Sequence, residues 1–110
     1  MAYRFIRAKP KTDSMTELHD RLENGEIEQM DPFGEAMTKS LTQARFDPDT
    51  QEAVWVEEDY CTPPLAMERD AVLDDYFDSI SIVDENVNEE DGWDKIQDLP
   101  SLWDRVLSQA

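Results

Sequence analysis

The sequence predicts an α+β fold in which helices pack on a four-stranded antiparallel sheet. Three observations lead to this prediction: segments with strand-like spacing of apolar residues alternate with segments of helical spacing, a strong turn joins two of the strands, and 39% of the chain is hydrophobic. At 110 residues the chain fits one domain, covering 1–110, that can bury a core without disulfides or metals.

The first two elements are a strand over 2–8 and a helix over 14–23. Apolar residues fall on both alternating faces of the strand, which is typical of a strand covered on each side. Ser14 and Glu17 have the spacing of a capping box, and apolar residues then recur at helical intervals. We therefore expect the helix to begin at this box.

Proline marks the second helix and the turn that follows it. Asp31 and Pro32 offer an N-cap and a first helical position, ahead of an apolar stripe with helical spacing. The segment 47–50 predicts a turn, because Asp47 can hydrogen-bond its own backbone while Pro48 presets φ at the second position. This turn should join two strands as a hairpin.

The second half of the chain continues with a strand rich in β-forming residues, which then enters a run of acids and is expected to emerge into solvent. A helix with one apolar and one acidic side follows from Leu65, and after it come a strand, an acidic loop and a terminal helix. The two strands are expected over 53–56 and 79–83, and the acidic loop over 84–91. The terminal helix is expected to dock through Leu102, Trp103, Val106 and Leu107.

This order of elements is that of the split βαβ, or ferredoxin-like, arrangement with an extra C-terminal helix. In that arrangement right-handed crossovers place the helices on one face of a four-stranded antiparallel sheet. The other face needs cover, and the alternatives are the terminal helix with Trp103, the loop with Trp93 and a second subunit. The fold class hosts enzymes, binding modules and regulators alike, so function has to be argued from sites.

Charge is distributed unevenly along the chain. Residues 1–12 carry four basic residues and no acid, whereas residues 47–94 carry seventeen acids against Arg69 alone, and the formal net charge is −17. Self-repulsion opposes the compact state of such a chain, so a cationic partner, bound cations or a salty solvent should compensate. Direct binding to nucleic acid or to an anionic membrane is not expected, because their phosphates repel an acidic protein.

The function that this charge favours is that of a small acidic, non-enzymatic binding protein, an accessory or regulatory subunit or an inhibitor that docks a basic protein surface. Carboxylates would steer the partner and aromatic residues would anchor it. A special case is a nucleic-acid mimic, whose carboxylates imitate phosphates. The candidate partner-binding residues are Trp55, Glu57, Glu58, Asp59, Tyr60, Glu68, Asp70, Asp74 and Asp78.

Two alternatives of other classes stay open. The first is a salt-adapted, halophilic-type domain whose acids hold hydrated cations, although the acid-free first twelve residues fit it less well. The second is a small ferredoxin-like enzyme with a pocket between helices and sheet. Cys61 and His19 have the side chains of a nucleophile and a base. The acids near Cys61, however, favour the neutral thiol, which argues against thiol catalysis. No catalytic residue and no cofactor is therefore assigned.

The stretch from Asp84 resembles the start of a calcium loop, since Asp84, Asn86 and Asn88 occupy its first, third and fifth positions. The sixth position, which needs glycine, is Glu89, and the twelfth, which needs a bidentate acid, is Lys95. We expect a solvated acidic loop that attracts cations loosely.

The basic first strand needs a partner of its own. Arg4 and Arg7 point to opposite sides of the strand, so at least one should meet an acid of the same domain, while Lys9 and Lys11 lie near an exposed strand end. Head-to-tail self-association into a homo-oligomer is the alternative.

A lone cysteine and the absence of a secretory or membrane-length apolar run predict a cytoplasmic protein.

Overall fold

The computed structural model of the chain describes residues 2–59 and 65–107. Within them, four strands form one antiparallel sheet in the order β2-β3-β1-β4. The α+β class and the four-stranded antiparallel sheet that the sequence predicts are therefore confirmed. The strands are β1 (Ala2–Pro10), β2 (Arg45–Asp47), β3 (Glu52–Asp59) and β4 (Phe77–Val87).

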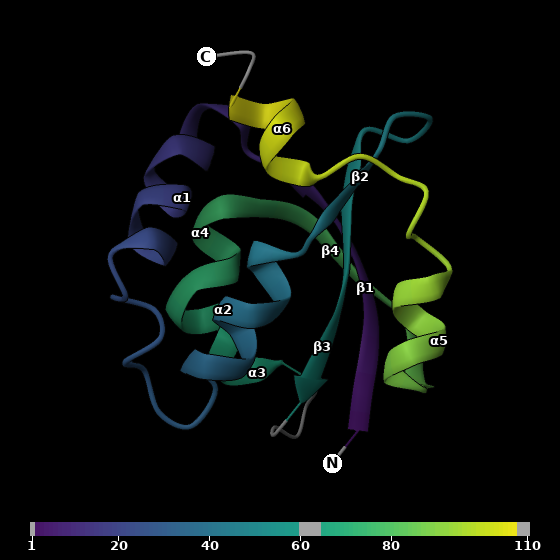
Figure 1. Cartoon of the computed structure of the whole chain (residues 1–110). Coiled ribbons are helices and arrows are strands. Elements are labelled where there is room, and N and C mark those ends of the chain that lie inside the picture. The colour runs from purple at the N-terminus through teal and green to yellow at the C-terminus, as the bar shows by residue number, and fades with distance from the viewer. Residues whose placement is uncertain (1, 60–64, 108–110) are drawn as a thin grey trace.

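Helices cover both faces and one end of this sheet (Figure 1). On one face lie α1, α2 and a continuous helical run made of α3, the π-helical turn η2 and α4, whereas α5 lies on the other face and α6 closes one end. Their bounds are α1 (Met15–Glu23), α2 (Gly34–Thr42), α3 (Ala66–Glu68), η2 (Arg69–Leu73), α4 (Asp74–Tyr76), α5 (Glu89–Asp94) and α6 (Leu102–Leu107), with a 3-10 turn η1 (Thr12–Ser14) before α1.

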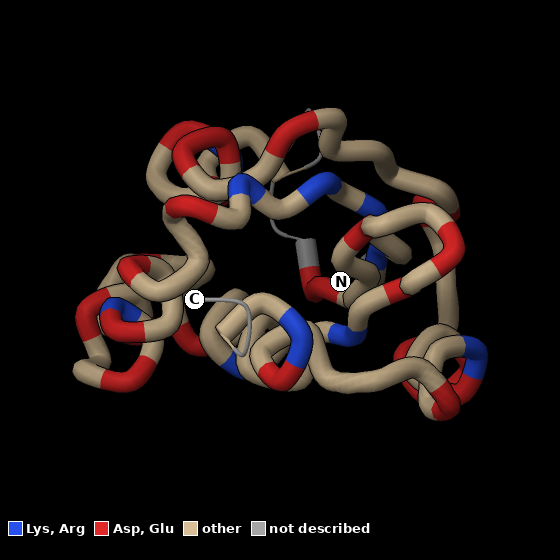
Figure 2. Tube along the Cα trace, turned by 90° about the horizontal axis from the view of Figure 1, so that it is seen from above, with Lys and Arg blue, Asp and Glu red and all other residues tan. Residues whose placement is uncertain are grey.

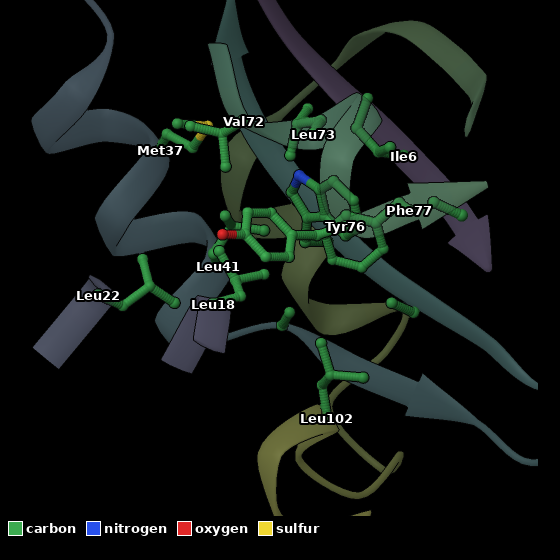
Figure 3. Close-up of a cluster of buried hydrophobic side chains, with 14 of the residues drawn as sticks. Ile6, Leu18, Leu22, Met37, Leu41, Val72, Leu73, Tyr76, Phe77 and Leu102 are labelled. Carbon is green, nitrogen blue, oxygen red and sulfur yellow. The ribbon is translucent and has the colours of Figure 1, made fainter. Parts of the chain in front are cut away.

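The main core fills the space between the sheet and the helices of the first face. Figure 3 shows apolar side chains from β1, α1, α2, the α3–α4 run and α6 meeting there. Trp55 of β3 is fully buried in this layer, with its ring centroid 5.1 Å from that of Phe77. The labelled members are Ile6, Leu18, Leu22, Met37, Leu41, Val72, Leu73, Tyr76, Phe77 and Leu102.

A smaller core lies between the opposite face of the sheet and α5. It consists of Phe5, Val54, Val56, Val87 and Ile96, with Trp93 packed against it. Of the three alternatives for covering this face, the segment that carries Trp93 is the one observed within the chain. Trp103 belongs to the main core instead, where its Nε1 donates to the Leu41 carbonyl at 2.8 Å.

The turn between β2 and β3 forms as the sequence predicts. The backbone N–H of Asp49 donates to Asp47 Oδ1 at 3.0 Å, and the N–H of Gln51 donates to the Asp47 carbonyl at 2.8 Å. Gln51 completes the turn in a left-handed conformation, with φ of 61°. The Asx-type hydrogen bond and the proline at the second position are the local causes that the sequence analysis identified.

Helix starts differ from the sequence prediction. Ser14 makes no side-chain cap hydrogen bond, because η1 already supplies a turn of helix ahead of α1, so the expected capping box does not form. The second helix begins at Gly34 rather than at Pro32, and Phe33 is its N-cap residue. Phe33 itself is buried in the main core.

Two predictions for the acidic segments are corrected. The strand β3 does not emerge into solvent after Val56, since Glu57 is fully buried. The segment 84–91 is not a loop, because β4 continues to Val87, whose side chain packs in the smaller core, and α5 begins at Glu89.

Arg4 and Arg7 of β1 meet partners within the chain, as the sequence predicts for at least one of them. Arg7 Nη1 donates to Asp47 Oδ2 at 2.9 Å and lies 3.4 Å from Glu52 Oε1, and the Arg4 guanidinium donates to the Glu85 carbonyl. Lys11 Nζ donates to the Asp74 carbonyl at 3.0 Å.

No helix in the described part of the chain is long and apolar enough to cross a bilayer.

Candidate functional site

The helical run from Ala66 to Tyr76 is amphipathic, and this determines what it presents to solvent. Val72, Leu73 and Tyr76 face the main core and are buried. Asp70 and Asp74 fall on the opposite side and are exposed. Burial of the apolar side therefore holds the carboxylates outward on a packed helix rather than on a loop.

Contacts around Tyr76 join this run to α1. The Tyr76 hydroxyl donates to Glu17 Oε2 at 2.9 Å and accepts from Arg21 Nη1 at 2.9 Å. Burial raises the pKa of Tyr76, with Glu17 adding to the rise and Arg21 opposing it. The same contact with Tyr76 raises the pKa of Arg21, which also pairs with Glu26 at 2.5 Å. The two helical segments thus form one surface.

We call this surface the acidic face. Its members are exposed carboxylates of α1 and of the segment 70–78, the two segments that Tyr76 joins, namely Glu17, Asp20, Asp70, Asp74, Asp75 and Asp78. Two of them are paired: Asp74 Oδ1 lies 3.0 Å from Arg69 Nε, and Asp78 Oδ1 lies 3.9 Å from Lys11 Nζ. Asp20, Asp70 and Asp75 form no ion pair with any residue that the structure describes.

Three of the nine residues that the sequence assigns to partner binding are inaccessible. Trp55, Glu57 and Glu68 are fully buried, and Trp55 Nε1 donates to Glu57 Oε1 at 2.8 Å. The period of two along a strand places Trp55 and Glu57 on the same face, so Trp55 as a core residue carries Glu57 inward with it. The two-residue spacing from Trp55 is therefore the signal in the sequence that predicts a buried Glu57.

The other assigned residues divide into three groups. Asp70, Asp74 and Asp78 belong to the acidic face. Glu58 is half-buried, and its Oε2 accepts from the Tyr3 hydroxyl at 3.0 Å, a bond that raises the pKa of Tyr3. Tyr60 and the side chain of Asp59 lie outside the described residues. Sequence reasoning missed Glu17 and Asp20, because nothing local shows that α1 packs beside α4.

The calcium-like motif does not form a loop around a cation. Asp84 Oδ1 accepts from the backbone N–H of Asn86 at 3.0 Å, and both residues lie in the extended strand β4. Asn88 is the N-cap of α5, where its Oδ1 accepts from the N–H of Asp91 at 3.2 Å. No group of three or more His, Cys, Asp or Glu side chains suited to a metal occurs among the described residues.

Cavities occur at the surface, because core side chains fill the layer between helices and sheet. One groove of about 420 Å³ runs between the end of α2 and α5 and includes Gln43, Trp93 and Asp94. Another cavity, of about 220 Å³, adjoins His19, whose ring centroid lies 5.2 Å from that of Trp103. Cys61, the other member of the imagined catalytic pair, lies outside the described residues.

Comparison of the chain with protein-family models, curated proteins and solved structures finds no match in any of the three. Function therefore has to be argued from the surface and its charges.

Proposed function

We propose that the protein is a small acidic, non-enzymatic binding protein that docks a basic protein surface through the acidic face. The observation that carries the proposal is the presence there of exposed carboxylates without an ion-pair partner among the described residues, held on packed helices. The backbone of Asp70 and Asp75 is already ordered, because the inner side of their helical run is buried. Docking through them therefore costs little backbone conformational entropy.

Electrostatics would act mainly on association rate and specificity. Charges that line a partner surface of opposite sign steer the encounter, and salt weakens this effect within a Debye length of about 10 Å at 0.1 M. Trp55 is buried and cannot anchor a partner, so the proposed affinity depends mainly on charge and should fall as salt is added. A nucleic-acid mimic remains a special case of this proposal, in which the basic surface is a nucleic-acid-binding cleft.

The test compares two variants with the same change in net charge. Asp70→Lys with Asp75→Lys alters the acidic face, and Glu90→Lys with Asp94→Lys alters exposed acids of α5 on the other face of the sheet. Each immobilised protein is incubated with lysate of the source cells in dilute salt, and bound proteins are quantified by mass spectrometry. We expect a discrete basic protein that the wild type and the α5 variant retain and the acidic-face variant loses.

Equal retention by both variants would refute docking through the acidic face. The special case has a further test: added protein should displace nucleic acid from the captured partner in a competition assay. If the partner keeps its nucleic acid, the special case of a nucleic-acid mimic is refuted, whereas docking to a basic protein surface still stands.

A specific observation also favours the salt-adapted alternative. Acidic positions lie around the whole outline of the chain in Figure 2, on helices and turns of both sheet faces. The lack of acids in the first strand, which argued against adaptation, is explained by the inner place of β1 between β3 and β4. Thermal unfolding from about 0.1 M to 3 M potassium chloride separates the two: adaptation requires stability that rises far into the molar range, whereas docking requires a domain already stable at the low end.

We also propose that the fold is a variant of the ferredoxin-like arrangement, in one domain and in a cytoplasmic protein. The strand order β2-β3-β1-β4, with every neighbouring pair antiparallel, supports this assignment. The chain departs from that arrangement in having α5 on the face opposite to α1 and α2. An experimental structure that placed β4 next to a strand other than β1 would contradict it.

A further inference from the structure

A cavity of about 220 Å³ lies where the end of β1, the tip of the β2–β3 hairpin and α6 meet. Three segments that are far apart in the sequence contribute to it, so it exists only in the folded chain. Its lining residues are Lys9, Pro10, Thr12, Phe46, Gln51, Arg105 and Val106.

The charge of this cavity is opposite to that of the protein. Two of the ten Lys and Arg side chains, Lys9 and Arg105, line it, and none of its described lining residues is acidic. Four comparable cavities on the described surface each include at least one Asp or Glu. In a chain with 27 acids, a cavity whose described charged residues are both cations favours an anion as its occupant.

The two cations differ in their surroundings. The cross-strand neighbour of Lys9 is Asp78, but Asp78 lies within ion-pair distance of Lys11, at 3.9 Å. The Arg105 guanidinium lies over the Phe46 ring, 5.1 Å from its centroid, which holds its plane against an apolar surface. Lys9 itself is exposed at the rim.

The floor of the cavity is apolar and its rim can form hydrogen bonds. Phe46 and Val106 are each 5% exposed, so both are fixed by packing. The Thr12 hydroxyl and the Gln51 amide are neutral groups that can donate to an anion. A ligand with one anionic group and one flat apolar group matches this division better than an inorganic ion does.

Gln51, the left-handed residue that completes the β2–β3 turn, also lies at this cavity. Its φ of 61° lies in the left-handed region, which glycine adopts more readily than glutamine. Its Nε2 donates to the Pro48 carbonyl at 3.1 Å, which orients the side chain beside the cavity.

We propose that this cavity binds a small organic anion, a carboxylate or a phosphate monoester, with its charged group between Lys9 and Arg105 and its apolar part against Phe46 and Val106. The net charge of −17 slows the approach of an anion but does not prevent binding, because repulsion from distant acids is screened beyond about 10 Å at 0.1 M salt. The cavity adjoins the acidic face at Asp78, the cross-strand neighbour of Lys9, but its binding of an anion does not depend on the docking function.

The test uses phenyl phosphate and benzoate as probes, titrated into the full chain at about 0.1 M salt. Calorimetry gives the affinity, and NMR follows the side-chain amide of Gln51. We expect saturable binding of at least one probe with a shift of the Gln51 signals, and the stronger probe identifies whether the anionic group is phosphate or carboxylate. Failure of both probes to saturate would overturn the proposal.

Two substitutions of exposed lysines separate a site from a general charge effect. Lys9→Gln removes a cation from the cavity, and Lys95→Gln removes one at the end of α5, outside the cavity. We expect Lys9→Gln to weaken binding about tenfold, equivalent to about 1.4 kcal/mol, and Lys95→Gln to leave it unchanged. Equal effects of the two substitutions, or no effect of either, would overturn the proposal.

Gln51→Gly provides a second variant. Glycine relieves the strained φ, so the variant should be at least as stable as the wild type while binding the probe more weakly. Undiminished binding by a stable Gln51→Gly protein would contradict the role given to this side chain.

Discussion

Gly34 is the position where a single methyl group should be most damaging. It is the first residue of α2 and is buried against the backbone of the segment that follows α1. A β-carbon at Gly34 would lie 2.4 Å from the carbonyl oxygen of Ile27 and 2.6 Å from that of Glu28. Both neighbours are backbone atoms, and Ile27 is anchored by its fully buried side chain, so Gly34→Ala forces the chain itself to move.

Two opposing effects determine the magnitude. Alanine is favoured over glycine in a helix by about 1 kcal/mol, which would stabilise the variant. Overpacking costs about 1–3 kcal/mol, and the upper end applies here because two backbone oxygens must shift. We therefore expect a net loss of about 2 kcal/mol in the free energy of unfolding.

Gly92→Ala is the matched comparison. A β-carbon at Gly92 of α5 would lie 2.6 Å from Cγ2 of Val56 and 3.2 Å from Cγ2 of Val87. These are side-chain methyl groups that can yield by small rotations, so the overpacking cost falls in the lower part of its range. The gain in helix propensity offsets most of it, and the expected net loss is at most about 1 kcal/mol.

Urea unfolding followed by tryptophan fluorescence measures both variants against the wild type. A lower midpoint with an unchanged slope would report stability alone. The reasoning would be refuted if Gly34→Ala were as stable as the wild type, or less destabilised than Gly92→Ala.

Two further predictions concern pH. Arg7, through its hydrogen bond of 2.9 Å, lowers the pKa of Asp47, so the stability from this pair is present above the unfolded pKa of about 3.9 and is lost as pH falls through the folded one. The difference in unfolding free energy between the wild type and Asp47→Asn should shrink on acidification from about pH 6 to 2, and a constant difference would contradict this. Burial raises the pKa of Tyr76, so its contribution is complete below the unfolded pKa of about 10 and is lost as pH rises. Tyr76→Phe should cost about 1 kcal/mol at neutral pH and reduce the alkaline loss of stability; an unchanged alkaline profile in urea melts would argue against it.

Local patterns in the sequence were sufficient where the cause of the structure is itself local. The hairpin turn depends on the side chain of Asp47 and the ring of Pro48, and it forms as expected. The terminal helix α6 buries Leu102, Trp103 and Val106, in agreement with their helical spacing.

The candidate site shows where local patterns were insufficient. Asp70 and Asp74 are exposed as expected, because helical periodicity alone places them opposite the apolar side. Glu57 was assigned to the surface by its charge, yet it is buried beside Trp55 because alternation along β3 overrides the preference of a single side chain. The joining of α1 to α4 through Tyr76 depends on residues 59 positions apart and has no local signal.

The sequence by itself determined the α+β class, the order of the elements as far as β4 and the excess of negative charge, because backbone periodicity, turn chemistry and composition are properties of short segments. Tertiary structure alone decided that α5 covers the second face of the sheet, that Glu57 is buried, and that Lys9 and Arg105 share a cavity. These features depend on which faces meet when the apolar surfaces of distant segments are buried together, and burial of that kind is non-directional and cannot be read from spacing along the chain.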